Sequence, residues 1–288
     1  MSTALLYESH MHTPLCKHAE GEPGEYAERA ALRGLKGIIV TCHNPIPGGW
    51  SADVRMAPSE FDQYCDMVAE AREQYKGRVD VRLGLESDFV PGMEGWLEEL
   101  HGKAEFHHIL GSVHPQVGAY MKRYFQGDWF AYQKLYFEHL AQAAETGLFD
   151  TLAHPDLVKN LSPEEWDLDR IFPDILRALD RIQKSGTAME LNTSGVNKSL
   201  PEMNPGPQIL AAMAEREIPV VIGADAHVPE RVGDGYEDAL DLLEASGYRE
   251  ISFFLARRRQ TAGIAEARAS LMPLAHADAP VAPAKNFP

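Results

Sequence analysis

Three histidines lie within nine residues near the start of the chain, in the segment His10-Met11-His12-Thr13-Pro14-Leu15-Cys16-Lys17-His18. The apolar run that precedes them predicts a strand over 5–10. Alternate side chains of a strand share a face, so His10 and His12 can bind one cation through neutral imidazole nitrogens. A single His-x-His pair is also compatible with solvated or core histidines. The test is therefore whether further ligands follow later strands.

Metal-ligand residue types recur where later strands are predicted to end. The strands are expected over 37–43, 79–86, 106–113, 149–153, 187–191 and 219–224, and their ends carry His43, Glu86, His114, His154, Asn192 and the pair Asp225 and His227. The last pair repeats the one-residue spacing of the first. Ligand types at six of seven strand ends favour one shared metal site over scattered histidines.

Helical patterns separate these strands, over 22–35, 59–75, 93–100, 128–146, 171–184, 208–216 and 237–245. Ser59 and Asp128 are expected to cap two of them. Helical crossovers indicate parallel strand pairing, which favours a single TIM-like α/β barrel. Active sites of such barrels form at the carboxyl ends of the strands. An open doubly wound sheet is the alternative, but it would spread the strand ends along a line.

The end of the chain changes in composition. We expect a closing strand over 250–255, followed by a solvated arginine run, Arg257-Arg258-Arg259. From Met272 the chain is rich in alanine and proline, which predicts a disordered tail over 272–288. The prediction is therefore one barrel domain over 1–271 with a tail.

Charge and composition limit the function. The 288 residues are 44% hydrophobic, carry a formal net charge of −16, and contain no apolar run of about 20 residues that would cross a bilayer. The acidic balance argues against nucleic-acid polymers and anionic membranes as partners and favours a small substrate. Three cysteines, Cys16, Cys42 and Cys65, show no disulfide framework or paired metal spacing, and no signal peptide is evident. These features predict a cytoplasmic protein and leave its oligomeric state open.

Taken in order, the motifs resemble the PHP family of metallophosphoesterases, and most closely its histidinol-phosphatase type. The motifs that carry the resemblance are His10-Met11-His12-Thr13, Cys16-Lys17-His18, Thr41-Cys42-His43, Gly84-Leu85-Glu86-Ser87-Asp88, Gly111-Ser112-Val113-His114, Ala153-His154-Pro155-Asp156, Glu190-Leu191-Asn192-Thr193-Ser194-Gly195 and Gly223-Ala224-Asp225-Ala226-His227. The match extends over roughly 7–254. It implies a distorted seven-stranded (β/α)7 TIM-like barrel of the PHP type.

The resemblance also implies three divalent metal ions, which can be zinc, iron or manganese, held by nine residues. It assigns His10, His12, Glu86 and Asp225 to the first metal, lets Glu86 bridge to a second metal with His114 and His154, and assigns His18, His43 and His227 to the third. Imidazole and carboxylate together suit these metals. The remaining histidines, His101, His107, His108, His139 and His276, are interpreted as surface or core residues.

Clustered divalent ions activate a water and clamp the oxygens of a phosphate, so the expected nucleophile is a metal-bridging hydroxide. Glu86, Asp225 and His227 are the predicted catalytic residues. Four basic side chains in loops after strands, Arg55, Lys159, Lys198 and Arg231, are candidates for binding the substrate phosphate. One departure concerns the substrate, because many relatives have an arginine near the position of Asn197.

The predicted function is a metal-dependent phosphoric monoester hydrolase of histidine biosynthesis that releases inorganic phosphate from histidinol phosphate. The alternative is a phosphoesterase or phosphodiesterase of the same family that acts on another small phosphoester, such as a nucleotide. A metal-dependent hydrolase of C–N bonds fits less well, because the chain lacks the pattern of a metal-bridging lysine. A binding module with a degenerate site conflicts with the complete set of nine ligands.

Overall fold

The computed structural model describes residues 4–272, and its main feature is a parallel seven-stranded sheet whose strand order follows the sequence. The strands are β1 (Tyr7–Glu8), β2 (Gly37–Val40), β3 (Asp80–Asp88), β4 (His108–Ser112), β5 (Thr151–Leu152), β6 (Ala188–Asn192) and β7 (Val220–Gly223). A parallel bridge between Met11 and Ala226, just beyond β1 and β7, joins the two ends of the sheet. The predicted seven-stranded barrel is therefore confirmed.

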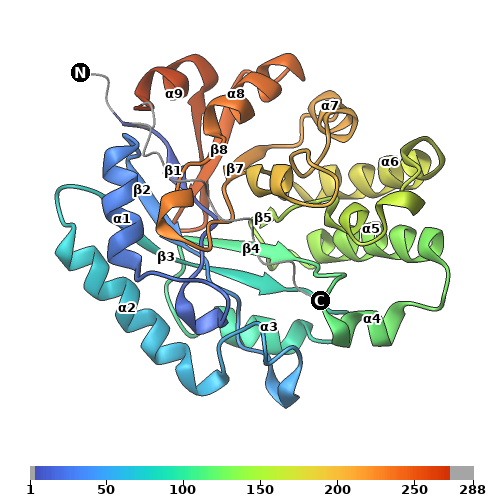
Figure 1. Cartoon of the computed structure of the whole chain (residues 1–288), viewed down its shortest axis with the longest axis horizontal. Coiled ribbons are helices and arrows are strands. Elements are labelled where there is room, and N and C mark those ends of the chain that lie inside the picture. Colours follow the sequence, from blue (N-terminus) through green and yellow to red (C-terminus); the bar gives the residue numbers. More distant parts are fainter. Residues whose placement is uncertain (1–3, 273–288) are drawn as a thin grey trace.

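Helices surround this barrel (Figure 1). They are α1 (Pro23–Leu32), α2 (Phe61–Gln74), α3 (Glu94–His101), α4 (Gly118–Tyr124), α5 (Trp129–Glu145), α6 (Leu168–Ser185), α7 (Pro207–Glu215), α8 (Tyr236–Ala245) and α9 (Ile264–Ser270). Asp128 caps α5 as predicted, because its carboxylate accepts a hydrogen bond from the Ala131 amide at 3.1 Å. Ser59 does not cap α2. It lies in a 3₁₀ turn, Pro58–Glu60, in which Glu60 accepts from the Ala57 amide at 2.6 Å.

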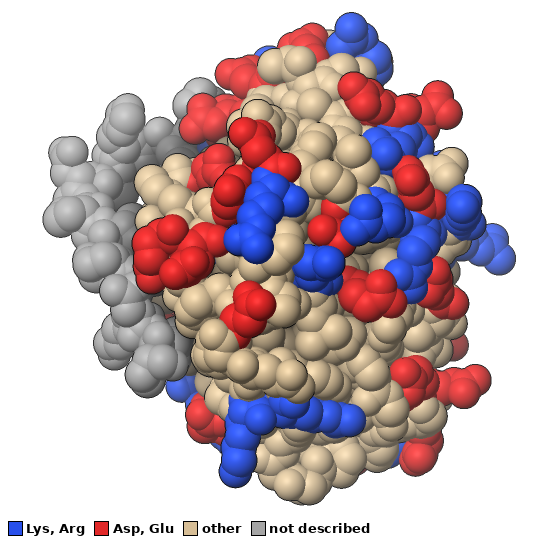
Figure 2. All heavy atoms as spheres, turned by 90° about the vertical axis from the view of Figure 1, so that its right-hand side faces the viewer, with Lys and Arg blue, Asp and Glu red and all other residues tan. Residues whose placement is uncertain are grey.

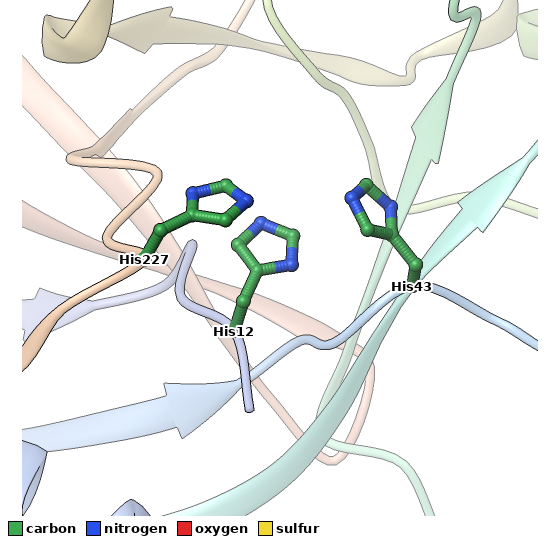
Figure 3. Close-up of side chains that lie close together, drawn as sticks. All are labelled: His12, His43 and His227. Atoms are coloured by element: carbon green, nitrogen blue, oxygen red, sulfur yellow. The ribbon is translucent and has the colours of Figure 1, made fainter. Parts of the chain in front are cut away.

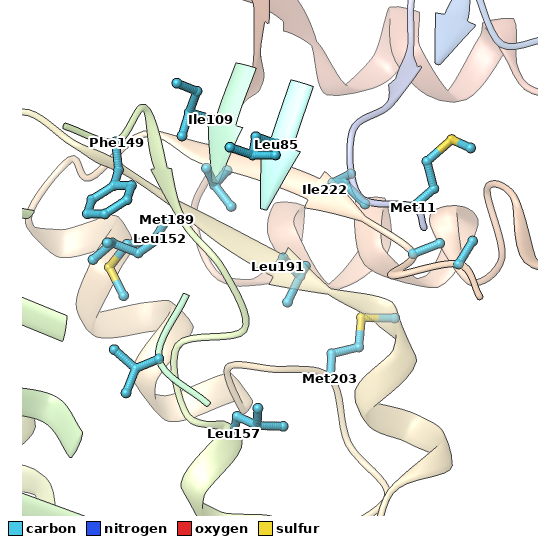
Figure 4. Close-up of a cluster of buried hydrophobic side chains, with 14 of the residues drawn as sticks. Met11, Leu85, Ile109, Phe149, Leu152, Leu157, Met189, Leu191, Met203 and Ile222 are labelled. Carbon is cyan, nitrogen blue, oxygen red and sulfur yellow. The ribbon is translucent and has the colours of Figure 1, made fainter. Parts of the chain in front are cut away.

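Apolar side chains on the strands pack between the barrel wall and the helices. Leu85, Ile109, Leu191 and Ile222 come from four different strands and lie in one buried cluster (Figure 4). The strands are buried on both faces, which is why their sequences read as continuous apolar runs. This core holds the strand ends in register and so fixes where the polar residues at those ends lie.

The segment expected to form a closing strand has a different role. Its strand, β8 (Glu250–Leu255), pairs antiparallel with β9 (Arg258–Gly263) in a separate two-stranded sheet, so the prediction that it joins the barrel wall was wrong. Phe254 packs in a buried cluster with Ala188 and Val221, and its ring stacks on His108 at a centroid distance of 5.1 Å. Since these residues belong to the first halves of β4, β6 and β7, the hairpin covers the amino end of the barrel.

The arginine run is only partly solvated. Arg258 and Arg259 are exposed, but Arg257 donates from Nε to both Asp150 oxygens at 3.0 Å and from Nη2 to the Leu148 carbonyl at 2.8 Å. The interpretation of the run as a solvated face is therefore corrected for Arg257. This residue anchors the hairpin to the start of β5.

The predicted tail and the absence of membrane spans are the remaining expectations from the sequence. Apart from Met272, the predicted tail over 272–288, with His276, lies outside the described residues, and the domain boundary at 271 stays a prediction. Within 4–272, none of the helices combines the length and the apolarity that spanning a membrane requires. Figure 2 shows acidic and basic side chains interspersed on one face of the molecule.

The fold also fixes the positions of four histidines outside the nine-residue set: His101, His107, His108 and His139. His139 allows a prediction about how stability depends on pH. Burial lowers the pKa of His139 to about 4, and its Nδ1 atom lies 2.5 Å from the Tyr120 hydroxyl. An unfolded histidine has a pKa near 6.5, so below pH 6.5 the unfolded chain binds the proton first and stability falls until about pH 4.

Replacing His139 with glutamine keeps an acceptor for Tyr120 and removes this titration. We expect the loss of unfolding free energy between pH 7 and pH 4.5 to be about 2 kcal/mol smaller in the variant than in the wild type. Urea unfolding at the two pH values measures the difference. The same pH dependence in both proteins would contradict a neutral, buried His139.

Candidate metal centre

The nine residues predicted as metal ligands gather at the carboxyl end of the barrel. His10 and His12 follow β1, His43 follows β2, Glu86 lies within β3, His114 follows β4, His154 follows β5, and Asp225 and His227 follow β7. His18 comes from the loop between β1 and α1, just after the 3₁₀ turn Pro14–Cys16. The strand that supplies none of them is β6, which contributes other polar groups described below.

Glu86 is at the centre of this group. Five imidazole rings place a nitrogen near its carboxylate oxygens: His43 Nδ1 at 2.8 Å, His154 Nε2 at 3.1 Å, His114 Nε2 at 3.3 Å, His10 Nε2 at 3.4 Å and His12 Nε2 at 3.6 Å. The side chain is fully buried. A carboxylate surrounded in this way has two oxygens with which to reach two different cations.

The rings of His12, His43 and His227 form a second part of the cluster (Figure 3). Each offers a nitrogen within 4.8 Å of the others. The His12 and His227 rings are stacked with centroids 4.0 Å apart, and the His18 ring lies 4.7 Å from that of His227. Asp225 lies beside this group, with Oδ1 3.0 Å from His12 Nε2.

Hydrogen bonds fix which ring nitrogen faces the centre. His18 Nδ1 lies 2.7 Å from the Cys16 carbonyl oxygen, and His227 Nδ1 lies 3.0 Å from the Asp225 carbonyl oxygen. A carbonyl oxygen only accepts, so each Nδ1 carries the proton and Nε2 keeps a lone pair. This arrangement is typical of histidines that bind metals.

Buried polar atoms in the cluster also fit a divalent metal. His10 Nε2 and Glu86 Oε2 are both buried and make no hydrogen bond of good geometry with any described residue. Burial raises the pKa of Glu86, but the nearby imidazoles of His43, His10 and His114 outweigh it and hold this pKa well below its usual value. Metal binding needs ionised carboxylates and neutral imidazoles.

The imidazole of His18 meets the second of these requirements. Burial and the neighbouring rings of His43 and His12 lower its pKa to about 4. The ring is therefore neutral at pH 7. A neutral imidazole is the form in which histidine binds a metal.

Two carboxylates behind the ligands were not predicted as site residues. Glu190 Oε1 lies 2.7 Å from His10 Nδ1, and Asp88 Oδ1 lies 3.1 Å from His114 Nδ1. Glu190 and Asp88 are buried near the carboxyl ends of β6 and β3. The usable sequence signal was the presence of acidic residues near the carboxyl ends of predicted strands.

Arg55 and Lys159, two of the predicted phosphate ligands, are occupied by protein groups. Arg55 is buried and donates to the Asn44 carbonyl at 3.0 Å and to Asp88 at 2.5 Å. The ammonium of Lys159 is fully buried, and it donates to Asp156 at 2.8 Å, Glu202 at 2.9 Å and the Met203 carbonyl at 3.3 Å. The prediction of Lys159 as a phosphate ligand is corrected, because its three protons already have acceptors within the protein.

Lys198 and Arg231 lie in the loops after β6 and β7 and are half-buried. The Lys198 ammonium has no ion-pair partner within the described part of the chain. Burial raises the pKa of Asp225, but His10 and His12 outweigh it, and Lys198 adds a smaller lowering contribution. Arg231 pairs with Asp234 at 3.1 Å, and with the Asn197 amide oxygen turned toward it, the two atoms Nη1 and Nη2 donate to that oxygen at 3.0 and 2.9 Å. Asn197 therefore lies against a guanidinium group.

Comparison with known proteins identifies the class of protein. The PHP domain family matches residues 8–194, and the chain belongs to this family. A probable histidinol-phosphatase of Deinococcus radiodurans is 38% identical over 255 residues, which cover 86% of this chain and 96% of the relative. The histidinol-phosphatase of Bacillus subtilis is 25% identical over 264 residues, which cover 81% of this chain and 98% of the relative.

A solved structure has the same fold. The histidinol phosphate phosphatase of Lactococcus lactis, crystallised with zinc, L-histidinol and phosphate, superposes with a TM-score of 0.73 at 18% identity, over 88% of this chain and 98% of that one. The putative histidinol phosphatase of Listeria monocytogenes gives a TM-score of 0.72 at 19% identity, over 81% of this chain and 99% of that one. Both similarities support the barrel topology.

Proposed function

We propose that this protein is a metal-dependent phosphatase that releases inorganic phosphate from histidinol phosphate. The observation that carries the proposal is the buried Glu86 carboxylate with ring nitrogens of five histidines within 3.6 Å. The similarity to the Deinococcus relative, which extends over almost its full length, supports the choice of substrate. Assignment of the nine ligands to three particular metals is part of the proposal.

In the proposed reaction the chain holds the cations, orients the phosphoester and excludes bulk water. Divalent cations, when bound, would lower the pKa of a coordinated water and neutralise the charge of the phosphate. Glu86 would supply a negatively charged ligand to the cations, and Asp225 offers a second carboxylate, with one oxygen 3.6 Å from His10 Nε2. Asp225 and His227 are the proposed groups that pass a proton to the leaving alcohol.

Lys198 and Arg231 are the proposed phosphate-binding side chains. Both belong to loops at the end of the barrel that carries the cluster, and the charge of Lys198 already acts on Asp225. Arg231, held by Asp234 and Asn197, places a positive charge near the cluster that can attract the phosphate. Many relatives have an arginine near the position of Asn197. In this chain Asn197 instead contacts Arg231, which comes from a different loop.

A second candidate is hydrolysis of a different small phosphoester, such as a nucleotide. It is favoured by Asn197 and by its neighbour Val196, which is 45% exposed in the 3₁₀ turn Thr193–Asn197. These side chains can change which leaving group fits beside the phosphate. The phosphomonoesterase chemistry is the same in either case.

The experiment that tests the function is phosphate release from a panel of substrates. Histidinol phosphate, nucleoside monophosphates and a bis-aryl phosphodiester are each assayed with manganese, zinc or iron, with a chelator-treated sample as the control. We expect histidinol phosphate to give the highest kcat/KM and the chelated enzyme to be inactive. A higher kcat/KM for a nucleotide or the diester would overturn the choice of substrate.

Replacing Lys198 with alanine should lower kcat/KM for histidinol phosphate about tenfold or more. A charge-assisted hydrogen bond to phosphate contributes about 1.5 to 3 kcal/mol. Metal content should stay at the wild-type value, because Lys198 is not among the ligands. Lys184, an exposed lysine near the end of α6 that leads to the opposite end of the barrel, provides the matched control Lys184→Ala. Equal kcat/KM values for Lys198→Ala and Lys184→Ala would show that Lys198 does not bind the substrate phosphate.

The proposed compartment is the cytoplasm. Cys16, Cys42 and Cys65 are free thiols, and Cys16 and Cys42 are buried beside the histidine cluster. A reducing environment would keep these thiols from cross-linking next to His18 and His43. Fractionation of cells that express the protein, with the redox state of the thiols as a second readout, tests this assignment.

A further inference from the structure

Glu190 is a fully buried carboxylate on β6, the strand that contributes no predicted ligand. Oε1 lies 2.7 Å from His10 Nδ1. Oε2 accepts from the His154 backbone amide at 2.8 Å and from Asn192 Nδ2 at 3.0 Å. Two oxygens thus serve three donors, and two of these donors belong to residues of the metal centre.

The contact with His10 fixes the state of that ring. A carboxylate at hydrogen-bond distance holds the proton on Nδ1. Nε2, which lies 3.4 Å from a Glu86 oxygen, would then be the nitrogen that binds a cation. The negative charge of Glu190 also makes the imidazole a more basic ligand.

The contact with His154 fixes the backbone instead of the ring. His154 has a φ of 30°, in the left-handed region that residues other than glycine rarely adopt. Its amide is held by Glu190, and its carbonyl accepts from the Tyr136 hydroxyl at 2.9 Å. These two bonds keep the strained residue in the conformation that places its ring 3.1 Å from Glu86.

The neighbouring strand leaves room for this carboxylate. A Cβ atom at Gly223 would lie 2.1 Å from Glu190 Oε1 and 2.7 Å from the Cβ atom of His10. Any side chain at Gly223 would therefore displace Glu190, His10 or both. The close approach explains why glycine ends β7 immediately before Ala224 and Asp225.

We infer that Glu190 is a positioning residue that orients one ligand of each of two metals, His10 through its ring and His154 through its backbone. This inference rests on the metal centre of the proposed function and extends it to a residue that does not itself bind the metal. A glutamine in the same place cannot replace it, since its amide NH₂ would face at least one of the three donors.

The test is the metal affinity of the Glu190→Gln variant, measured by zinc titration with bound metal determined by elemental analysis. We expect the zinc concentration for half-saturation to rise about 10- to 100-fold, and excess zinc to restore most of the hydrolysis of a small aryl phosphate. Asp150→Asn is the matched control, because Asp150 also accepts from a backbone amide and an arginine but lies at the amino end of β5. An unchanged zinc affinity in Glu190→Gln would overturn the inference.

A second measurement uses the wild-type protein and does not depend on whether the variant folds. In the zinc-loaded protein labelled with ¹⁵N-histidine, we expect His10 to be protonated at Nδ1, with a slowly exchanging proton, and bound to zinc through Nε2. Protonation at Nε2 would overturn the role of Glu190. Neither measurement uses histidinol phosphate, so a failure of that substrate to react would count against the proposed function alone.

Discussion

Replacing Glu86 with glutamine is expected to lower phosphate release by about a thousandfold or more and to reduce the amount of bound metal. The substitution keeps the shape of the side chain and removes the charge that lies within 3.6 Å of five histidine ring nitrogens. Cations contribute several kcal/mol of transition-state stabilisation in such centres, which corresponds to about 10³ in rate.

Metal content by elemental analysis and kcat with saturating manganese measure this effect. Glu98→Gln on the exposed side of α3 is the control that removes the same charge from the surface, and it should behave as the wild type. If Glu86→Gln kept the metal content and the turnover of the wild type, the proposal that Glu86 bridges two metals would be wrong.

The second large effect is on stability, and it concerns Lys159. We expect Lys159→Met to lower the free energy of unfolding by about 3 to 5 kcal/mol, because Asp156 would remain as a buried carboxylate without its cation. Asp156 would keep only its bonds from Asn204 and from the Gly206 amide. The loss should be visible as a lower urea midpoint.

A second variant separates the structural role of Lys159 from substrate binding. The double variant Lys159→Met, Asp156→Asn removes both charges and should recover part of the lost stability. At a temperature where Lys159→Met is folded, its kcat/KM should be close to that of the wild type. A tenfold lower kcat/KM for Lys159→Met, with stability unchanged, would instead show that Lys159 binds the substrate.

The barrel could be predicted from the sequence because its signals are local. Each strand is a short apolar run, each crossover has helical spacing, and the residue that follows a strand lies at a known end of a parallel barrel. Strands β1 and β5 are nevertheless only two residues long, which the longer apolar runs in the sequence did not predict.

The errors share a different physical cause. The strand pattern over 250–255 is correct, but which strand it pairs with depends on β9 and on the packing of Phe254. Burial of Lys159 depends on Glu202, 43 positions away, and the role of Glu190 depends on His10, 180 positions away. A contact between distant residues leaves no local pattern to read.

The bridge that completes the ring of strands lies inside the metal centre. Met11 is between His10 and His12, Ala226 is between Asp225 and His227, and the two bridging hydrogen bonds measure 2.9 and 3.0 Å. The first and last strands of the barrel, more than 200 positions apart, are thus joined by the same residues that would hold a cation. Cation binding should then stabilise this junction between the first and last strands. We expect the amides of His12 and Ala226 to exchange hydrogen more slowly in the loaded protein than in the chelated one.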